Sequence, residues 1–260
     1  MLDIFGISTA QFETFLLVFM RVTTMLFVFP IFSAMQIPTQ LRLGLGVVMS
    51  FMLFRLVPAV PAAANLYDLL AAVVSQLVLG MIVGIVASLV FTGISFAGEL
   101  IDLQIGFAVA NILSPQTQTE VTIIGEFELA IATLVFLATN SHYLLLQGIA
   151  GSFSLVPLPY ITLDPSVMGN IMLFFGQALT IVFKIAAPVA VSLFISNVAL
   201  AFMARVAPQM NVFVVGLPMQ ITVGLLLLAI SMPLIATVGT EVFNNLPFQM
   251  DTVMRGLRPH

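Results

Sequence analysis

Long apolar stretches alternate with short, proline-rich connections along most of the chain. Six apolar segments stand out, at residues 12–32, 43–60, 69–98, 121–140, 170–203 and 212–238. An α-helix rises about 1.5 Å per residue, so about 20 residues cross the hydrocarbon core of a bilayer. The first, second, fourth and sixth segments have about that length. The pattern therefore predicts an all-α fold with about six long apolar helices.

The third and fifth segments are longer than one crossing requires, because about 30 residues make a helix about 45 Å long. Tilt absorbs part of such an excess, and otherwise the helices bend or protrude. Gly80, Gly84 and Gly93 are places where the third segment could bend. Pro188 could kink the fifth, because proline removes a backbone donor.

The composition identifies these helices as membrane helices. Hydrophobic residues make up 61% of the 260 positions, charged residues only 7%, and the mean hydropathy is +1.20. A soluble domain carries about 25% charged residues, so this chain could not cover a surface that faces water. The net charge of −4 is small, and no run of Lys or Arg indicates a nucleic-acid partner.

The residue types exclude several kinds of chemistry. The chain has no cysteine, which excludes disulfides, thiolate metal sites and cysteine nucleophiles, and it has only two histidines. No nucleophile elbow, zinc-protease helix or glycine-rich phosphate loop is found. We therefore expect neither an enzyme nor a bound cofactor or metal.

Two cations interrupt the apolar segments. Arg21 lies midway along the first segment and Lys184 lies within the fifth. An arginine at the bilayer centre costs about 2.5–3.5 kcal/mol on insertion scales, so it requires carboxylates, carbonyls or water. An ion or proton path is one interpretation. The favoured one is an ion pair that locks helices or subunits together, because the acids do not lie midway through apolar runs.

The acids gather instead beside the most polar stretch of the chain. Glu99 and Asp102 are three residues apart, so they share one face if the helix continues. Paired carboxylates can carry out acid–base work, but no second chemical group lies near them in the sequence. A solvated or subunit-facing helix end is the favoured interpretation.

Three passages carry a resemblance to a known family. The passage ARVAPQMNVFVVGLP, at residues 204–218, is similar to the R-x-x-P-Q-x-x-x-F-x-x-G-x-P signature of the FliR family, which includes the SctT proteins of virulence-associated type III secretion. FAGELIDLQIGFAVANILSPQTQ, at residues 96–118, resembles the G-E-x-x-D-x-Q-x-G segment of that family and the loop after it. VFPIFSAMQIPTQLRLGL, at residues 28–45, resembles its first connection. The resemblance extends over essentially the whole chain.

This resemblance implies a subunit of the flagellar type III export gate in the basal body at the bacterial inner membrane. The subunit would assemble with FliP and FliQ, contact FlhB and membrane lipid, and help to pass unfolded flagellar proteins. Residues 1–165 would form a FliP-like helical part, and residues 166–260 a FliQ-like helical hairpin with a short tail. The alternative is a proton-coupled or small-solute transporter, with Arg21, Lys184 and Asn197 as its candidate polar residues.

The stretch GFAVANILSPQTQTE, at residues 106–120, is small, polar and almost uncharged. Irregular backbone at membrane depth is tolerated only where protein or a water-filled cavity surrounds it. In the FliR family this loop lies in the pore as a plug, and the alternative is an ordinary external loop. The residues predicted to form the plug are Gly106, Phe107, Val109, Ala110, Asn111, Ile112, Leu113 and Pro115.

A second group of residues is expected to act in assembly. They are the two cations within the apolar segments, the paired acids and the 204–218 signature, which we expect to be a turn between the last two long helices. The group consists of Arg21, Glu99, Asp102, Lys184, Arg205, Pro208, Gln209, Asn211, Phe213, Gly216 and Pro218.

Overall fold

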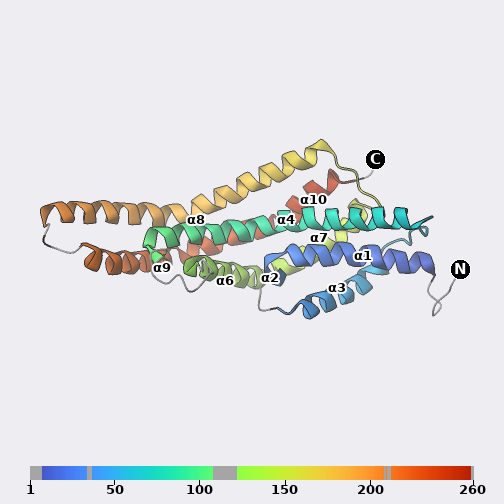
Figure 1. Cartoon of the computed structure of the whole chain (residues 1–260), viewed down its shortest axis with the longest axis horizontal. Coiled ribbons are helices and arrows are strands. Elements are labelled where there is room, and N and C mark those ends of the chain that lie inside the picture. Colours follow the sequence, from blue (N-terminus) through green and yellow to red (C-terminus); the bar gives the residue numbers. More distant parts are fainter. Residues whose placement is uncertain (1–7, 34–36, 108–121, 208, 210–211, 259–260) are drawn as a thin grey trace. The chain divides into compact units, whose positions relative to one another are not determined.

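The computed structural model describes residues 8–33, 37–107, 122–207, 209 and 212–258. These residues form nine helices and no strand, which confirms the predicted all-α fold. In chain order the helices are α1 (Thr9–Val28), α2 (Pro30–Ser33), α3 (Thr39–Phe54), α4 (Leu66–Ile105), α6 (Ile123–Ala138), α7 (Ser141–Leu155), α8 (Pro165–Val206), α9 (Val212–Asn244) and α10 (Leu246–Arg255) (Figure 1).

The predicted count of about six long apolar helices is too high. Among the described residues, four stretches are long and apolar enough to cross a membrane: Thr9–Val28, Leu66–Ile105, Pro165–Val206 and Val214–Arg255. The pair α6 and α7 would make a fifth if both belong to one broken span. The second predicted segment, 43–60, forms only the 16-residue α3, because its C-terminal part runs into the proline-rich connection around Pro58 and Pro61.

Local sequence signals explain where several helices begin and end. Ser8 and Gln11 form a reciprocal capping box at the start of α1, in which each side chain satisfies a backbone N–H of the other residue. Asn140, between α6 and α7, has a left-handed φ of 58°. Asparagine tolerates that region better than most residues, so the chain stops one helix and starts another within two residues.

The helix α4 is unbroken over its 40 residues, so the glycines predicted as possible bends do not interrupt it. They lie instead where other helices come close. A Cβ on Gly80 would lie 2.8 Å from the carbonyl oxygen of Arg21, and one on Gly84 would lie 2.9 Å from Cβ of Val28. The helix α8 likewise continues through Pro188 over 42 residues.

The chain divides into two compact units. Unit 1 comprises residues 1–89, 140–175 and 244–260, and unit 2 comprises residues 90–139 and 176–243. Three of the long helices, α4, α8 and α9, therefore contribute residues to both units. The division into 1–165 and 166–260 that the family resemblance implies stays a prediction.

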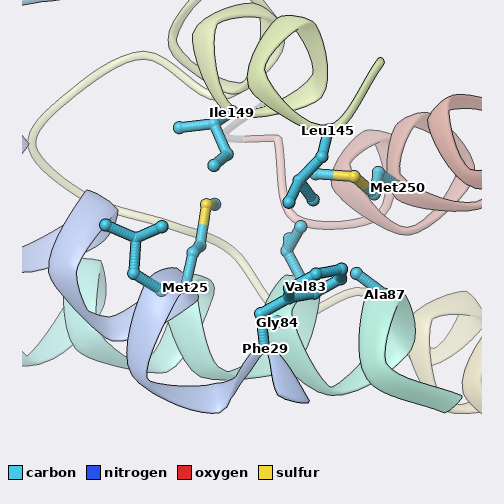
Figure 2. A pocket seen from close by; sticks show the side chains of 9 residues that line it. Met25, Phe29, Val83, Gly84, Ala87, Leu145, Ile149 and Met250 are labelled. Carbon is cyan, nitrogen blue, oxygen red and sulfur yellow. The ribbon is translucent and has the colours of Figure 1, made fainter. Parts of the chain in front are cut away.

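Unit 1 has a core built from α1, the first part of α4, α7 and α10. A small apolar cavity of about 10 Å³ lies there. Met25 of α1 and Met250 of α10 are among the side chains that line it (Figure 2). Met250 packs closely on Gly148 of α7, where a Cβ would lie 2.8 Å from its sulfur. Backbone bonds from Thr162 to Leu257 and from Asp164 to Gly256 then fasten the C-terminal segment beside the start of α8.

Unit 2 has an aromatic centre. Phe91 of α4, Phe136 of α6 and Phe243 of α9 lie with ring centroids 4.9–5.4 Å apart. All three side chains are buried. Rings at these separations add about 0.5–1.5 kcal/mol per pair beyond their area of burial, so the triad ties three helices together.

A close backbone contact in unit 2 joins α4 and α6. A Cβ on Gly98 would lie 2.7 Å from Cα of Gly125, and one on Gly125 would lie 3.2 Å from the carbonyl oxygen of Ser95. The two backbones touch directly, and only a residue without a Cβ fits at this crossing.

We predict that Gly98→Ala lowers the free energy of unfolding by about 1–3 kcal/mol, because its Cβ forces α4 and α6 apart. The measurement is the thermal unfolding midpoint of the purified protein. Gly176→Ala is the matched control, because no atom lies within 4 Å of its Cβ and alanine favours a helix by about 1 kcal/mol. A G98A protein as stable as the G176A protein would contradict the close crossing.

Candidate functional site

The described residues that flank the predicted plug come from the end of α4 and the start of α6. Gly106 follows the last residue of α4 and has a φ of 92°, a conformation that L side chains rarely adopt. Its N–H donates to the backbone oxygen of Asp102 at 3.1 Å. The sequence therefore places glycine where the chain must leave the helix in a left-handed conformation.

The end of α4 is seated against α9. Ile105 is fully buried, and its side chain fills the space beside Gly224, where a Cβ would lie 2.5 Å from Cγ1 of Ile105. A Cβ on Gly106 would lie 3.4 Å from Leu217 and 3.7 Å from Gln220. Leu217, Gln220 and Gly224 are spaced three and four residues apart, so one face of α9 receives the end of α4.

The start of α6 is held by a residue from α4. Oδ2 of Asp102 accepts a hydrogen bond from the backbone N–H of Ile124 at 3.1 Å. Thr122, the N-cap residue of α6, makes no side-chain cap bond of its own. Asp102 thus occupies the role that an N-cap side chain normally fills, and it does so from another helix.

The prediction of a solvated or subunit-facing acid pair is wrong for Asp102. The residue is 3% exposed, because the crossing at Gly98 and Gly125 brings the start of α6 over it. Glu99 is half-buried, and its Cγ borders Gly125. Glu128 of α6, a residue that sequence reasoning did not select, is fully buried, and neither of its carboxyl oxygens has a hydrogen-bond partner within the described part of the chain.

Only the first two of the predicted plug residues are described. Gly106 and Phe107 lie at the root of the loop, and the half-buried Phe107 directly follows the left-handed glycine. The remaining predicted plug residues lie outside the described residues: Val109, Ala110, Asn111, Ile112, Leu113 and Pro115.

Arg21 lies at the centre of a separate cluster in unit 1 and is fully buried. Its Nε donates to Oε1 of Gln76 at 2.8 Å, and its Nη1 donates to the backbone oxygen of Ser152 at 2.9 Å. Its guanidinium carbon lies 4.4 Å from the ring centroid of Phe153. The amide of Gln76 then donates to the backbone oxygen of Pro159.

The expected ion pair of Arg21 is not present among the described residues. An amide, a carbonyl and an aromatic face take the place of a carboxylate, and Nη2 has no hydrogen-bond partner in the described part of the chain. This arrangement joins α1, α4 and α7 without burying a negative charge. Because Arg21 is enclosed within its own chain, a role in assembly would be exerted through the fold of unit 1.

The expected turn at 204–218 lies between α8, which ends at Val206, and α9, which begins at Val212. Arg205 and Gln209 are exposed there. Gly216 and Pro218 lie inside the first two turns of α9, so the expected turn is shorter than the 204–218 signature. Pro208 and Asn211 lie outside the described residues, as does the side chain of Phe213.

Two further polar residues of unit 2 were not predicted to bond to each other. Nε2 of Gln220 on α9 donates to Oδ1 of Asn197 on α8. Lys184, also in α8, is exposed. The signal that could have found the pair is that each amide stands alone in an apolar run and requires a partner if it is buried.

Neither cluster has the composition of a catalytic or metal centre. Within the described ranges, no group of three or more His, Asp or Glu side chains could hold a metal ion. The geometry around Asp102 instead draws together the two flanks of a polar loop, and the geometry around Arg21 joins three helices.

The fold and composition together define an all-helical protein with several helices suited to a membrane. Residues 12–246 match the family described as bacterial export proteins, family 1. The chain therefore belongs to this family, and the resemblance predicted from its sequence is confirmed.

Named relatives agree with this assignment. The flagellar biosynthetic protein FliR of Bacillus subtilis (strain 168) is 35% identical over 243 residues, which cover 90% of this chain and 91% of the relative. FliR of Aquifex aeolicus (strain VF5) is 32% identical over 236 residues, with 89% and 90% covered. The Yop proteins translocation protein T of Yersinia pestis is 29% identical over 196 residues, with 71% and 73% covered.

We predict that Arg21→Lys lowers the free energy of unfolding by about 2 kcal/mol. An ammonium group cannot reproduce the planar fork that reaches both Gln76 and Ser152, and one hydrogen bond to a charged donor is worth about 1.5–3 kcal/mol. The thermal midpoint of the purified protein is the measurement. Arg55→Lys, at an exposed position of the same unit, should leave the midpoint unchanged. Equal midpoints for both variants would contradict a structural role for the cluster.

Proposed function

We propose that this chain is a core subunit of the flagellar type III protein export gate, and that it forms part of the channel through which unfolded flagellar subunits cross the inner membrane. The observation that carries this proposal is the match over residues 12–246 to a family of bacterial export proteins. The names of the relatives supply the finer description, because they include a flagellar biosynthetic protein and a translocation protein of another secretion system.

The gate would be an assembly of several proteins, with FliP, FliQ and FlhB as the partners of this chain. Supporting this, large apolar side chains are exposed along the long helices, including Phe175, Phe183, Phe194 and Phe202 of α8. Such side chains are stable only against lipid or other apolar protein surfaces. The division into a FliP-like part, 1–165, and a FliQ-like hairpin, 166–260, belongs to this proposal.

Three exposed polar residues of the described chain are candidates for direct contacts between subunits. Lys184, Arg205 and Gln209 project from α8 and from the turn after it. An exposed cation next to apolar surface gains when a partner supplies a carboxylate or a carbonyl. Arg21 and Asp102 would contribute indirectly, because both are buried within their own units.

Residues 106–120 would close the channel while no substrate passes. The stretch is almost uncharged, so it could be displaced without stranding a charge and without holding a passing polypeptide electrostatically. Apolar contact from side chains such as Ile112 and Leu113 would exclude water. The end of α4 packs against α9, and the start of α6 is bonded to Asp102 of α4, which supports a loop with a fixed root.

The alternative, a small-solute or proton-coupled transporter, gains no support from the polar residues that it would require. Arg21 bonds to Gln76 and Ser152, whereas Asn197 bonds to Gln220 and Lys184 is exposed. The buried Arg21 and the half-buried Asn197 thus both form hydrogen bonds within the protein.

The test of the proposal is to replace Ile112 and Leu113 with glycine in cells that express the chain. Each buried aliphatic side chain contributes roughly 1.5–3 kcal/mol, so losing two should shift a closed–open balance by about a hundredfold or more. We expect full recovery of the complex with FliP and FliQ, together with leakage of ions or small solutes across the inner membrane. Membrane conductance and uptake of a normally excluded solute are the measurements.

The matched control replaces Leu56 and Leu163, which are exposed in two other connections, with glycine. This control variant should assemble with FliP and FliQ, and the inner membrane should stay impermeable to the solute. An assembled complex that carries both loop substitutions and leaks no more than the control would contradict the plug. A chain that is recovered without FliP or FliQ would contradict membership in the gate.

A further inference from the structure

Asp102 makes contact with both flanks of the segment 107–121. Its backbone oxygen accepts from the N–H of Gly106, the last residue before the segment, at 3.1 Å. Its side-chain Oδ2 accepts from the N–H of Ile124, the second residue of α6, also at 3.1 Å. The first bond is the ordinary i→i−4 bond that closes the last turn of α4, whereas the second depends on the side chain of Asp102 and joins α4 to α6.

The second of these bonds replaces a missing helix cap. The first N–H groups of a helix have no partner within the helix, and a carboxylate near that end is favoured by the helix dipole. Thr122 is the N-cap residue of α6, but its side chain makes no cap bond. The N–H of Ile124 is buried with Asp102, so loss of the carboxyl group would leave a donor without a partner in apolar surroundings.

Two close contacts of α4 lie before and after Asp102 along the helix. Gly98, one turn before Asp102, touches Gly125 backbone to backbone, which sets the start of α6 directly over this part of α4. Further along α4, Ile105 packs on Gly224 of α9. Asp102 lies between these two contacts in the sequence, and its bond to Ile124 joins α4 to the start of α6.

A second buried acid, Glu128, lies near Asp102 but is placed differently. It is fully buried, and no hydrogen bond joins its carboxyl group to the first N–H groups of α6 among the described residues. Of the two buried carboxyl groups at this crossing, Asp102 is the one that reaches the backbone at the start of α6.

We propose that Asp102 is a positioning residue that clamps the two flanks of the segment 107–121 together through the N–H of Ile124. The clamp itself concerns only α4 and α6. Its consequence for export, a loop whose root stays in place when the loop moves, rests on the function proposed above. The carboxyl group acts here as an acceptor for a backbone donor and carries out no chemistry.

The test compares Asp102→Leu, Asp102→Asn and Thr122→Ala in the full chain, purified with the subunits that accompany it. Hydrogen–deuterium exchange in the peptide that spans residues 122–128 reports the protection of the Ile124 amide. We expect about tenfold or faster exchange in D102L, because a hydrogen bond to a carboxylate is lost. D102N keeps an acceptor oxygen and should stay close to wild type. T122A should also stay close, because the Thr122 side chain makes no cap bond.

A second variant covers the case in which D102L is not recovered as a folded protein. Asp102→Ser keeps a small polar group that is too short to reach Ile124, so exchange in the same peptide should rise as in D102L. Peptides of α8 and α9 around Asn197 and Gln220 should keep their wild-type exchange in every variant, which shows that any change is local.

Solute leakage, measured in parallel, distinguishes failure of the clamp from failure of the plug. Faster amide exchange together with solute leakage supports both the clamp and the plug. Faster exchange in an assembled complex that does not leak supports the clamp and counts against the plug. Unchanged exchange at residues 122–128 in D102L or D102S would contradict the clamp, whether or not solute leaks. A T122A protein whose exchange rises as much as that of D102L or D102S would also contradict it.

Discussion

The backbone contact between Gly98 of α4 and Gly125 of α6 is the constraint on which the rest of unit 2 depends. Two helices in direct backbone contact can neither slide along each other nor rotate against each other freely, because either movement brings a Cα or a carbonyl into collision. That fixed crossing brings Ile124 within 3.1 Å of Asp102 and leaves Glu128 in the same enclosed space. The two flanks of a polar loop are thereby held at one point.

A chain with so few charged residues must satisfy its buried polar groups largely with neutral partners. Arg21 bonds to an amide and a carbonyl and lies against an aromatic ring, and Asp102 bonds to a backbone N–H. Hydrogen bonds of this kind fix the direction of each contact, which apolar packing alone does not do. The polar loop at residues 106–120 itself contains a single charged residue, Glu120. In the proposed channel, an almost neutral closing segment would avoid selecting among unfolded polypeptides by their charge.

The sequence predicted those features that depend on neighbours along the chain. Apolar length predicted the long helices, although the third apolar segment, 69–98, ends seven residues before α4 does. Contacts between distant residues were beyond its reach. Asp102 and Ile124 are 22 positions apart, and Arg21 and Ser152 are 131 apart, so neither pair leaves a local pattern. Burial reversed the interpretation of Asp102 as a solvated acid, because that interpretation could not include the crossing at Gly125. Gly80 and Gly84 were possible places for a bend in α4, but they lie at close contacts with α1.

The central claim is that exported polypeptides pass directly beside the segment 106–120. The most direct measurement places a photo-crosslinking amino acid at Ile112 and, for comparison, at the exposed Tyr67 of unit 1, in cells that carry a flagellar subunit stalled during export by a fused, stably folded domain. The account predicts a crosslink between Ile112 and the stalled subunit, which disappears when no subunit is stalled, and no such crosslink from Tyr67. A stalled subunit that crosslinks to Tyr67 and not to Ile112 would contradict the account.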